Sequence, residues 1–108
     1  MDLKIIAIVQ ARFSSTRLPG KVLKRVSGKS LLEILLYRLS KSKLIDTIIV
    51  ASGTSKENDI IEEHVKDLGH KIFRGSEDNV LKRFYDCALI NSADAIVRIT
   101  GDCPLIDP

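Results

Sequence analysis

The chain has 108 residues, of which 44% are hydrophobic and 29% charged, and its net charge is +3. These values are typical of one small soluble domain, and no apolar run approaches the roughly 20 residues that span a bilayer. Aromatic residues make up only 5% of the chain and its basic residues cluster near the N-terminus, which argues against nucleic-acid binding. The short N-terminal apolar run lacks a cleavage site, so we expect a cytoplasmic protein that binds no membrane.

The first predicted element is a buried strand at Lys4–Gln10, followed by a long loop, Ala11–Lys29. From Gln10 to Lys29 the chain carries six Lys and Arg residues but no Asp or Glu. Cations, hydroxyls and backbone N–H groups at the end of a parallel strand suit a polyanion such as a triphosphate. The alternative is a solvated basic rim.

A helix and a second strand come next. Ser30 and Glu33 form a capping box that predicts a helix from Leu31 to about Ser40. Thr47–Ala51 is rich in β-branched residues and uncharged, which predicts a strand.

A second capping box, Thr54–Glu57, predicts a helix that continues to Leu68 and stops at Gly69. Its expected buried stripe comprises Ile60, Ile61, His64, Val65 and Leu68.

The last elements are a short strand at Lys71–Phe73, a third helix and a strand at Ala95–Thr100. Ser76 is expected to open the helix, with Glu77 and Asp78 in its first turn, where acids favour the positive end of the helix dipole. The expected inner face of this helix comprises Val80, Leu81, Phe84 and Ala88.

This alternation predicts an α/β fold: a doubly wound, Rossmann-like, mostly parallel sheet in a three-layer α/β/α arrangement. Counting strands along the chain, the commonest order is 3-2-1-4, which makes the first and fourth strands neighbours. The loops after them then share one crevice, with cations on one side and Asp102 on the other. The fourth strand would be an apolar edge, so we expect residues 1–108 to be the N-terminal half of something longer, or a domain completed by a partner.

Two nucleotide-binding motifs are absent. Gly28–Ser30 resembles the end of a Walker A loop, but Leu23 stands where that motif needs Gly. No Gly-x-Gly-x-x-Gly follows the first strand, which argues against NAD or FAD. No His/Cys cluster indicates zinc, and Cys87 and Cys103 are expected to be free thiols.

Three segments, Val9–Lys21, Arg74–Phe84 and Val97–Ile106, resemble in order the cytidylyltransferases that make CMP-sugars. The spore-coat polysaccharide biosynthesis type is the most similar branch, and the acylneuraminate and 3-deoxy-manno-octulosonate enzymes are more distant. Members are about twice as long, with a fold of the nucleotide-diphospho-sugar transferase type. The resemblance therefore implies that residues 1–108 are the N-terminal nucleotide-binding part, with the C-terminal half absent.

The resemblance implies transfer of CMP from CTP to a sugar or sugar acid, with release of pyrophosphate, for surface or spore-coat polysaccharide. Arg12 and Lys21 match catalytic positions that hold the triphosphate. The nucleotide-binding residues it implies are Ala11, Arg12, Ser14, Ser15, Lys21, Arg74, Ser76, Asp78 and Thr100. Thr100 stands where sugar-acid relatives carry Gln, which leaves the base and the substrate open.

The resemblance also implies Mg²⁺ as the cofactor, with Asp102 as its ligand. A second expected carboxylate belongs to the missing half, as does most of the surface for a homodimer. The alternatives are a catalytically incomplete nucleotide-binding fragment, a related nucleotidyltransferase that uses another NTP, and an RNA-binding protein that uses the basic loop. The RNA-binding alternative predicts a steep loss of affinity with salt.

Overall fold

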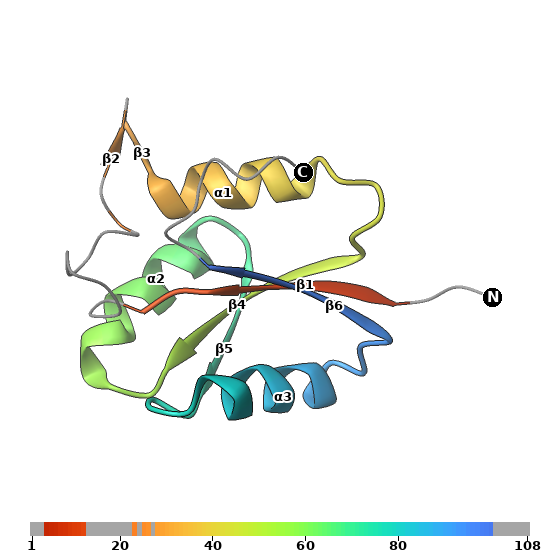
Figure 1. Cartoon of the computed structure of the whole chain (residues 1–108). Helices are drawn as coiled ribbons and strands as arrows, with labels where there is room; N and C mark the ends of the chain where they lie inside the picture. The colour runs from red at the N-terminus through yellow and green to blue at the C-terminus, as the bar shows by residue number, and fades with distance from the viewer. Residues whose placement is uncertain (1–3, 13–22, 24, 27, 101–108) are drawn as a thin grey trace.

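A computed structural model describes residues 4–12, 23, 25–26 and 28–100, which form a parallel four-stranded sheet with helices on both faces (Figure 1). Its strands are β1 (Ile5–Gln10), β4 (Thr47–Gly53), β5 (Lys71–Gly75) and β6 (Ala95–Thr100). The order is β5-β4-β1-β6, and every neighbouring pair is parallel. The predicted fold class and strand order are therefore confirmed, including the contact between the first and the last strand of this sheet.

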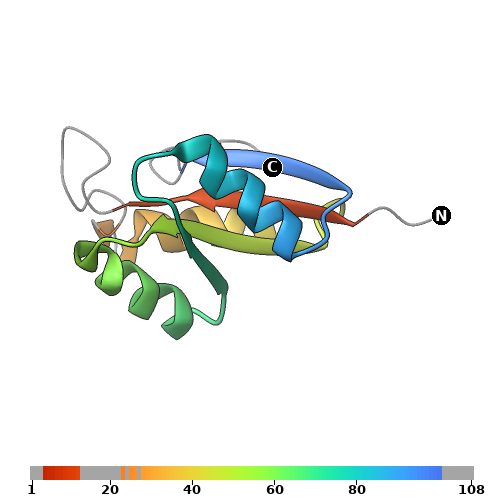
Figure 2. The ribbon, with the colours of Figure 1, turned by 90° about the horizontal axis from the view of Figure 1, so that it is seen from below.

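Three helices make the outer layers. α1 (Leu31–Ser40) and α2 (Asp59–Asp67) cover one face of the sheet, and α3 (Val80–Ile90) covers the other (Figures 1 and 2). The central strand β1 is apolar from Ile5 to Val9 because both of its faces are covered.

The side chains of β1 alternate between two cores, as the pleat of a strand requires. Ala7 and Val9 pack with the leucines of α1 and with Ile61 and Val65 of α2. Ile6 and Ile8 join the core beneath α3. These two cores fix β1 in the middle of the molecule, with its carboxyl end directed at the loop that begins at Ala11.

α1 begins as predicted. The backbone N–H of Glu33 donates to Ser30 Oγ at 3.0 Å, and this hydroxyl also lies 2.7 Å from His64 Nε2 of α2. Ser30 therefore caps α1 and ties it to α2. Before it, Arg25–Val26 (β2) and Lys29–Ser30 (β3) form a small antiparallel pair in what was predicted to be loop.

α2 starts later than the capping box predicts, because a 3₁₀ turn, η2 (Lys56–Asn58), precedes it. Gly69 follows the helix with φ +81°, as expected of a residue just after a helix end. The prediction that Ile60 is buried is wrong, since it is 52% exposed. Adjacent helical residues point about 100° apart, so Ile61 faces the sheet and Ile60 does not.

α3 differs from the prediction at two points. Its N-cap is Asn79 rather than Ser76: Asn79 Oδ1 accepts from the N–H of Lys82 at 3.0 Å, and the helix begins at Val80. Leu81 is 69% exposed rather than on the inner face, and Arg83 is fully buried. The inner face follows the spacing from Val80 through Arg83 to Cys87, which leaves Leu81 outside.

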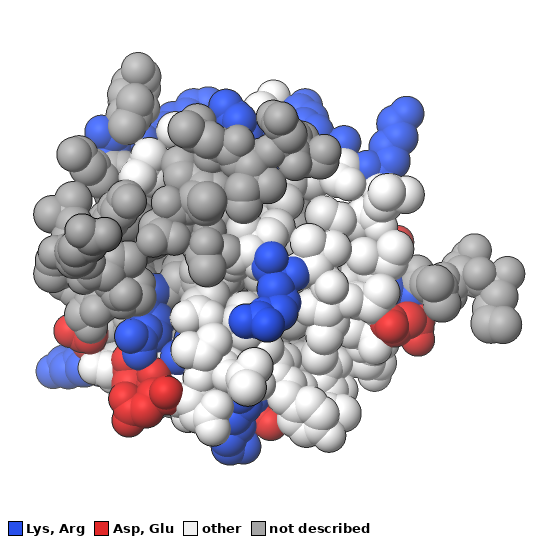
Figure 3. Space-filling view, in the orientation of Figure 1, with Lys and Arg blue, Asp and Glu red and all other residues white. Residues whose placement is uncertain are grey.

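β6 is an edge strand that pairs only with β1 in this sheet. Ile96 and Val97 are 42% and 40% exposed, as expected of an uncovered apolar edge. Figure 3, in the view of Figure 1, shows mostly uncharged side chains where the surface is described, with a positively charged side chain in their midst and others at the periphery. No helix in the described ranges is long and apolar enough to cross a bilayer.

Candidate functional site

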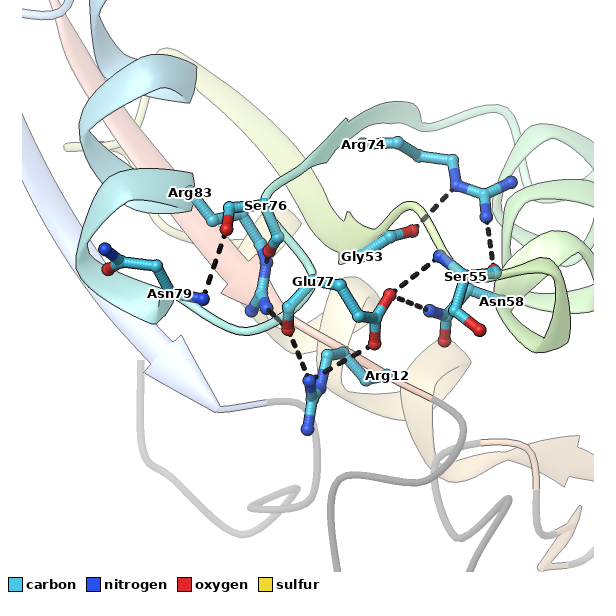
Figure 4. Close-up of polar contacts among 9 residues, drawn as sticks. All are labelled: Arg12, Gly53, Ser55, Asn58, Arg74, Ser76, Glu77, Asn79 and Arg83. Carbon is cyan, nitrogen blue, oxygen red and sulfur yellow. Dashed lines mark hydrogen bonds and ion pairs between the residues drawn. The ribbon is translucent and has the colours of Figure 1, made fainter.

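The candidate site lies where the carboxyl ends of β1, β4 and β5 approach the start of α3. Arg12 comes two residues after β1, and Glu77 lies in the turn between β5 and α3 (Figure 4). β6 ends beside β1, with Thr100 paired to Gln10. This is the topological switch point at which open α/β sheets bind ligands.

Arg12 is held by Glu77. Arg12 Nη1 donates to the backbone oxygen of Glu77 at 2.6 Å and lies 3.2 Å from its carboxylate Oε2. The two side chains are 22% and 24% exposed, so the ion pair stands at the protein surface without being fully hydrated. A guanidinium in such a position can bind an anion that approaches from solvent.

The other carboxylate oxygen of Glu77 faces the corner between β4 and α2. Glu77 Oε1 accepts from the N–H of Ser55 at 2.7 Å and from Asn58 Nδ2 at 3.2 Å (Figure 4). A Cβ at Gly53 would overlap this oxygen, so a side chain there would displace the Glu77 carboxylate. Glu77 thus bridges the ends of β1 and β4.

Arg83 supports this turn from below. Its Nε donates to Ser76 O and its Nη2 to Glu77 O, each at 2.9 Å, while its buried Nη1 has no hydrogen-bond partner among the described residues. Burial lowers the pKa of Arg83, the charge of Arg12 lowers it further, and Glu77 opposes both. Sequence reasoning missed Arg83 because it kept cations out of the core; only its spacing from Val80 could have found it.

Arg74, predicted to bind nucleotide, is engaged by the protein at all three nitrogens. Nε donates to Gly53 O at 2.9 Å and Nη2 to Ser55 O at 2.7 Å. Nη1 lies 2.6 Å from Asp59 Oδ1 and 2.9 Å from Glu62 Oε1. Hydrogen bonds to these two carboxylates raise the pKa of Arg74. In this structure Arg74 closes the corner between β4 and α2.

Two further predicted residues lie in the turn before α3. Ser76 Oγ accepts from the N–H of Asn79 at 3.1 Å, which shapes the turn, and Asp78 is exposed. Glu77 lies between them in the chain and connects this turn to Arg12 at the switch point. The sequence analysis treated Glu77 only as an acid at the positive end of a helix dipole.

Ala11 and Thr100 end the two neighbouring strands. The side chain of Ala11 is 1% exposed in the core, and its N–H donates to Ala51 O at 3.0 Å, so neither group is presented to a ligand. Thr100 ends β6 beside Gln10. This position agrees with a role at the switch point. That Thr100 contacts the nucleotide stays a prediction.

The remaining predicted residues, Ser14, Ser15, Lys21 and the metal ligand Asp102, lie outside the described residues. Among those described, no group of three or more His, Cys, Asp or Glu side chains could hold a metal. Glu77, the carboxylate nearest Arg12, is already committed to hydrogen bonds with the protein. The described residues therefore do not form a magnesium site by themselves.

The family model described as cytidylyltransferase matches residues 6–108. The chain is 41% identical over 108 residues to the spore coat polysaccharide biosynthesis protein SpsF of Bacillus subtilis, covering 96% of this chain and 45% of that protein. Among solved structures it resembles a cytidylyltransferase from Leptospira borgpetersenii, with a TM-score of 0.92, 40% identity, and coverage of 98% of this chain and 44% of that one.

A second structure is that of CMP:2-keto-3-deoxy-manno-octonic acid synthetase complexed with CTP. The TM-score is 0.85 and the identity 26%, with 97% of this chain and 43% of that one covered. This chain therefore spans less than half the length of each of these relatives. Because the family model covers nearly the whole chain and the parallel sheet agrees, the chain belongs to the cytidylyltransferase family.

Proposed function

We propose that the chain is the N-terminal nucleotide-binding part of an enzyme that transfers CMP from CTP to a sugar or sugar acid. In this reaction a sugar hydroxyl oxygen attacks the α-phosphorus, the bond to pyrophosphate breaks and the hydroxyl proton is lost. The likeness to SpsF favours a product used for surface or spore-coat polysaccharide. A homodimer and a cytoplasmic location stay predictions from the sequence.

The observation that carries this proposal is the position of Arg12. It follows the central strand at the switch point, and Glu77 directs its guanidinium along the carboxyl edge of the sheet. Membership of the cytidylyltransferase family favours CTP as the nucleotide. The position of Arg12 at the switch point favours an interaction of its guanidinium with the phosphates of that nucleotide. Charge stabilisation by fixed cations is the main contribution a protein makes to transfer at phosphorus.

Arg12 and Lys21 have complementary roles in the proposal. The planar guanidinium of Arg12 suits two phosphate oxygens at once, whereas the ammonium of Lys21 acts as a compact charge. Ser14 and Ser15 would donate hydrogen bonds to the same phosphates. Ser76, Asp78 and Thr100 would line the nucleoside side, together with Arg74 if its contacts with the protein rearrange. Ala11 would take part through its backbone carbonyl alone, because its side chain is buried and its N–H is bonded to Ala51.

Mg²⁺ is part of the proposal through Asp102. A hard cation that takes one or two carboxylates and bridges phosphates fits one aspartate beside a triphosphate. When bound, the ion would supply positive charge to the phosphates. Of the described residues, Arg12 would contact the same phosphates, and the carboxylate of Glu77 beside it is already hydrogen-bonded to Ser55 and Asn58.

One alternative is a nucleotide-binding part without turnover. It predicts CTP binding without release of pyrophosphate. A nucleotidyltransferase that uses another NTP is the second alternative, since a phosphate loop does not read the base.

Replacement of either cation tests the proposal. We expect Arg12→Ala and Lys21→Ala each to weaken CTP binding by about 1.5–3 kcal/mol, the range for hydrogen bonds to charged groups. Isothermal titration calorimetry measures the affinity, and circular dichroism checks that each variant is folded.

Matched controls come from the same basic segment. Arg25 donates to Gly28 O within its own hairpin, and Lys29 lies 5.6 Å from the ring of Tyr37. Arg25→Ala and Lys29→Ala should leave CTP affinity unchanged. Unchanged affinity in both Arg12→Ala and Lys21→Ala would exclude the proposed phosphate site.

A further inference from the structure

Glu77 makes contacts that bear on how Arg12 would meet a phosphate. We propose, on the basis of the proposed function, that Glu77 is a positioning residue that fixes the Arg12 guanidinium for the nucleotide triphosphate. Glu77 would not touch the nucleotide. It would act through Arg12, and the argument rests on the two ends of its carboxylate and on what holds the turn that carries it.

The carboxylate of Glu77 has a different partner at each oxygen. Oε2 and the backbone oxygen both contact Arg12 Nη1, at 3.2 and 2.6 Å. Oε1 is held at 2.7 Å by the N–H of Ser55 and at 3.2 Å by Asn58, a fully buried residue. Ordering an arginine side chain costs rotamer entropy, and this carboxylate couples the guanidinium to a fixed part of the fold.

Two features hold Glu77 itself in place. Gly53 leaves room for its carboxylate in this position, because a Cβ there would overlap Oε1. Arg83, fully buried, donates to the same backbone oxygen that accepts from Arg12. Burial of a cation costs free energy unless hydrogen bonds compensate it. Arg83 donates to the carbonyl oxygens of Ser76 and Glu77, which holds the turn that carries Glu77 in one shape.

Charge alone predicts the opposite effect from positioning. Glu77 is negative and lies beside the proposed triphosphate site, so neutralising it would strengthen anion binding if it had no other role. If Glu77 positions Arg12, neutralising it weakens binding instead. Shortening it to aspartate keeps the charge but removes the reach across both contacts, so positioning predicts a loss here too, whereas charge alone predicts no change.

A double-mutant cycle tests the proposal, with CTP affinity measured by calorimetry and folding by circular dichroism. We expect Glu77→Gln and Glu77→Asp each to weaken CTP binding about tenfold, and Glu77→Gln to change it less than about twofold when Arg12→Ala is already present. Gly53→Ala, which displaces the carboxylate, should also weaken binding if Glu77→Gln does not fold. Asp86→Asn is the matched control, because Asp86 is paired to Lys82, 30% exposed, and not in contact with Arg12.

The outcomes separate this proposal from the proposed function. Absence of CTP binding by the unmodified protein, or full binding by Arg12→Ala, contradicts the phosphate role of Arg12. Loss in Arg12→Ala together with unchanged or tighter binding in folded Glu77→Gln overturns the positioning role alone. An equal loss from Glu77→Gln with and without Arg12 also overturns it, because Glu77 would then act by another route.

Discussion

Arg12 and Arg83 direct two positive charges at one carbonyl oxygen, that of Glu77. Arg83 has no solvent exposure, and the nearby Arg12 further disfavours its charged form. Glu77 compensates both arginines in part, which explains why a turn in the candidate site carries an acid that sequence reasoning assigned only to a helix dipole. At this scale the chemistry depends on which side chains share a partner, and spacing along the chain does not reveal that.

Cys87 gives a prediction at the same scale. It is buried beneath α3, and burial raises the pKa of its thiol to about 11. In a Cys103→Ser background we expect Cys87 to resist a thiol reagent at pH 8 until urea unfolds the chain, because the thiolate is the reacting form. Rapid labelling of the folded protein would contradict this burial.

The raised pKa of Cys87 also makes the stability of the fold depend on pH. The thiol ionises in the unfolded chain near its ordinary pKa of 9.0 and in the fold only near about 11. Its contribution is therefore fully present below pH 9.0 and is lost as the pH rises to about 11. Between pH 9.0 and about 11, the free energy of unfolding measured with urea should therefore fall less in Cys87→Ala than in the unmodified protein.

At the scale of elements, helix ends decide what the candidate site contains. Ser30 closes the start of α1 and also contacts His64 of α2, so one hydroxyl serves two helices. Asn79 begins α3, which leaves Ser76 and Glu77 outside the helix and available to the turn. Had the helix started at Ser76, as predicted, Glu77 could not lie against Arg12.

The cap of α1 gives a prediction for stability. Ser30→Ala should lower the free energy of unfolding by about 1–2 kcal/mol, because the Glu33 N–H and His64 Nε2 both lose the hydroxyl of a buried residue. Urea unfolding measures this loss. Ser40→Ala, at the exposed end of the same helix, should stay within about 0.5 kcal/mol of the unmodified protein. Equal losses in the two variants would exclude a special role for Ser30.

The sequence predicted elements better than their inner faces. Strand positions and the Ser30 cap follow from local chemistry, since apolar runs and hydroxyl caps act within a few residues. Ile60 and Leu81 were placed inside because both are large and apolar, yet helix geometry gives the inner position to a neighbour. Arg83 was missed because a cation is not expected in a core, although its spacing from Val80 places it on the inner face; its contacts with Ser76 and Glu77 form only in the fold.

At the scale of the whole molecule, strand order brings the candidate site together. β1 pairs with β4 on one side and β6 on the other, so the carboxyl ends of these strands lie at one edge of the sheet. The sequence predicted this order, because parallel crossovers allow few arrangements. It predicted Arg12 at this edge but not the path from Arg12 through Glu77 to Gly53, which joins residues from three strand ends.

The most direct test is calorimetric titration of the folded protein with CTP, UTP, GTP and ATP, each with and without Mg²⁺. A cytidylyltransferase nucleotide site predicts that CTP binds more tightly than the other three and that its affinity falls when Mg²⁺ is removed. A folded protein that binds none of the four nucleotides, or binds all four equally whether or not Mg²⁺ is present, would contradict the proposed function.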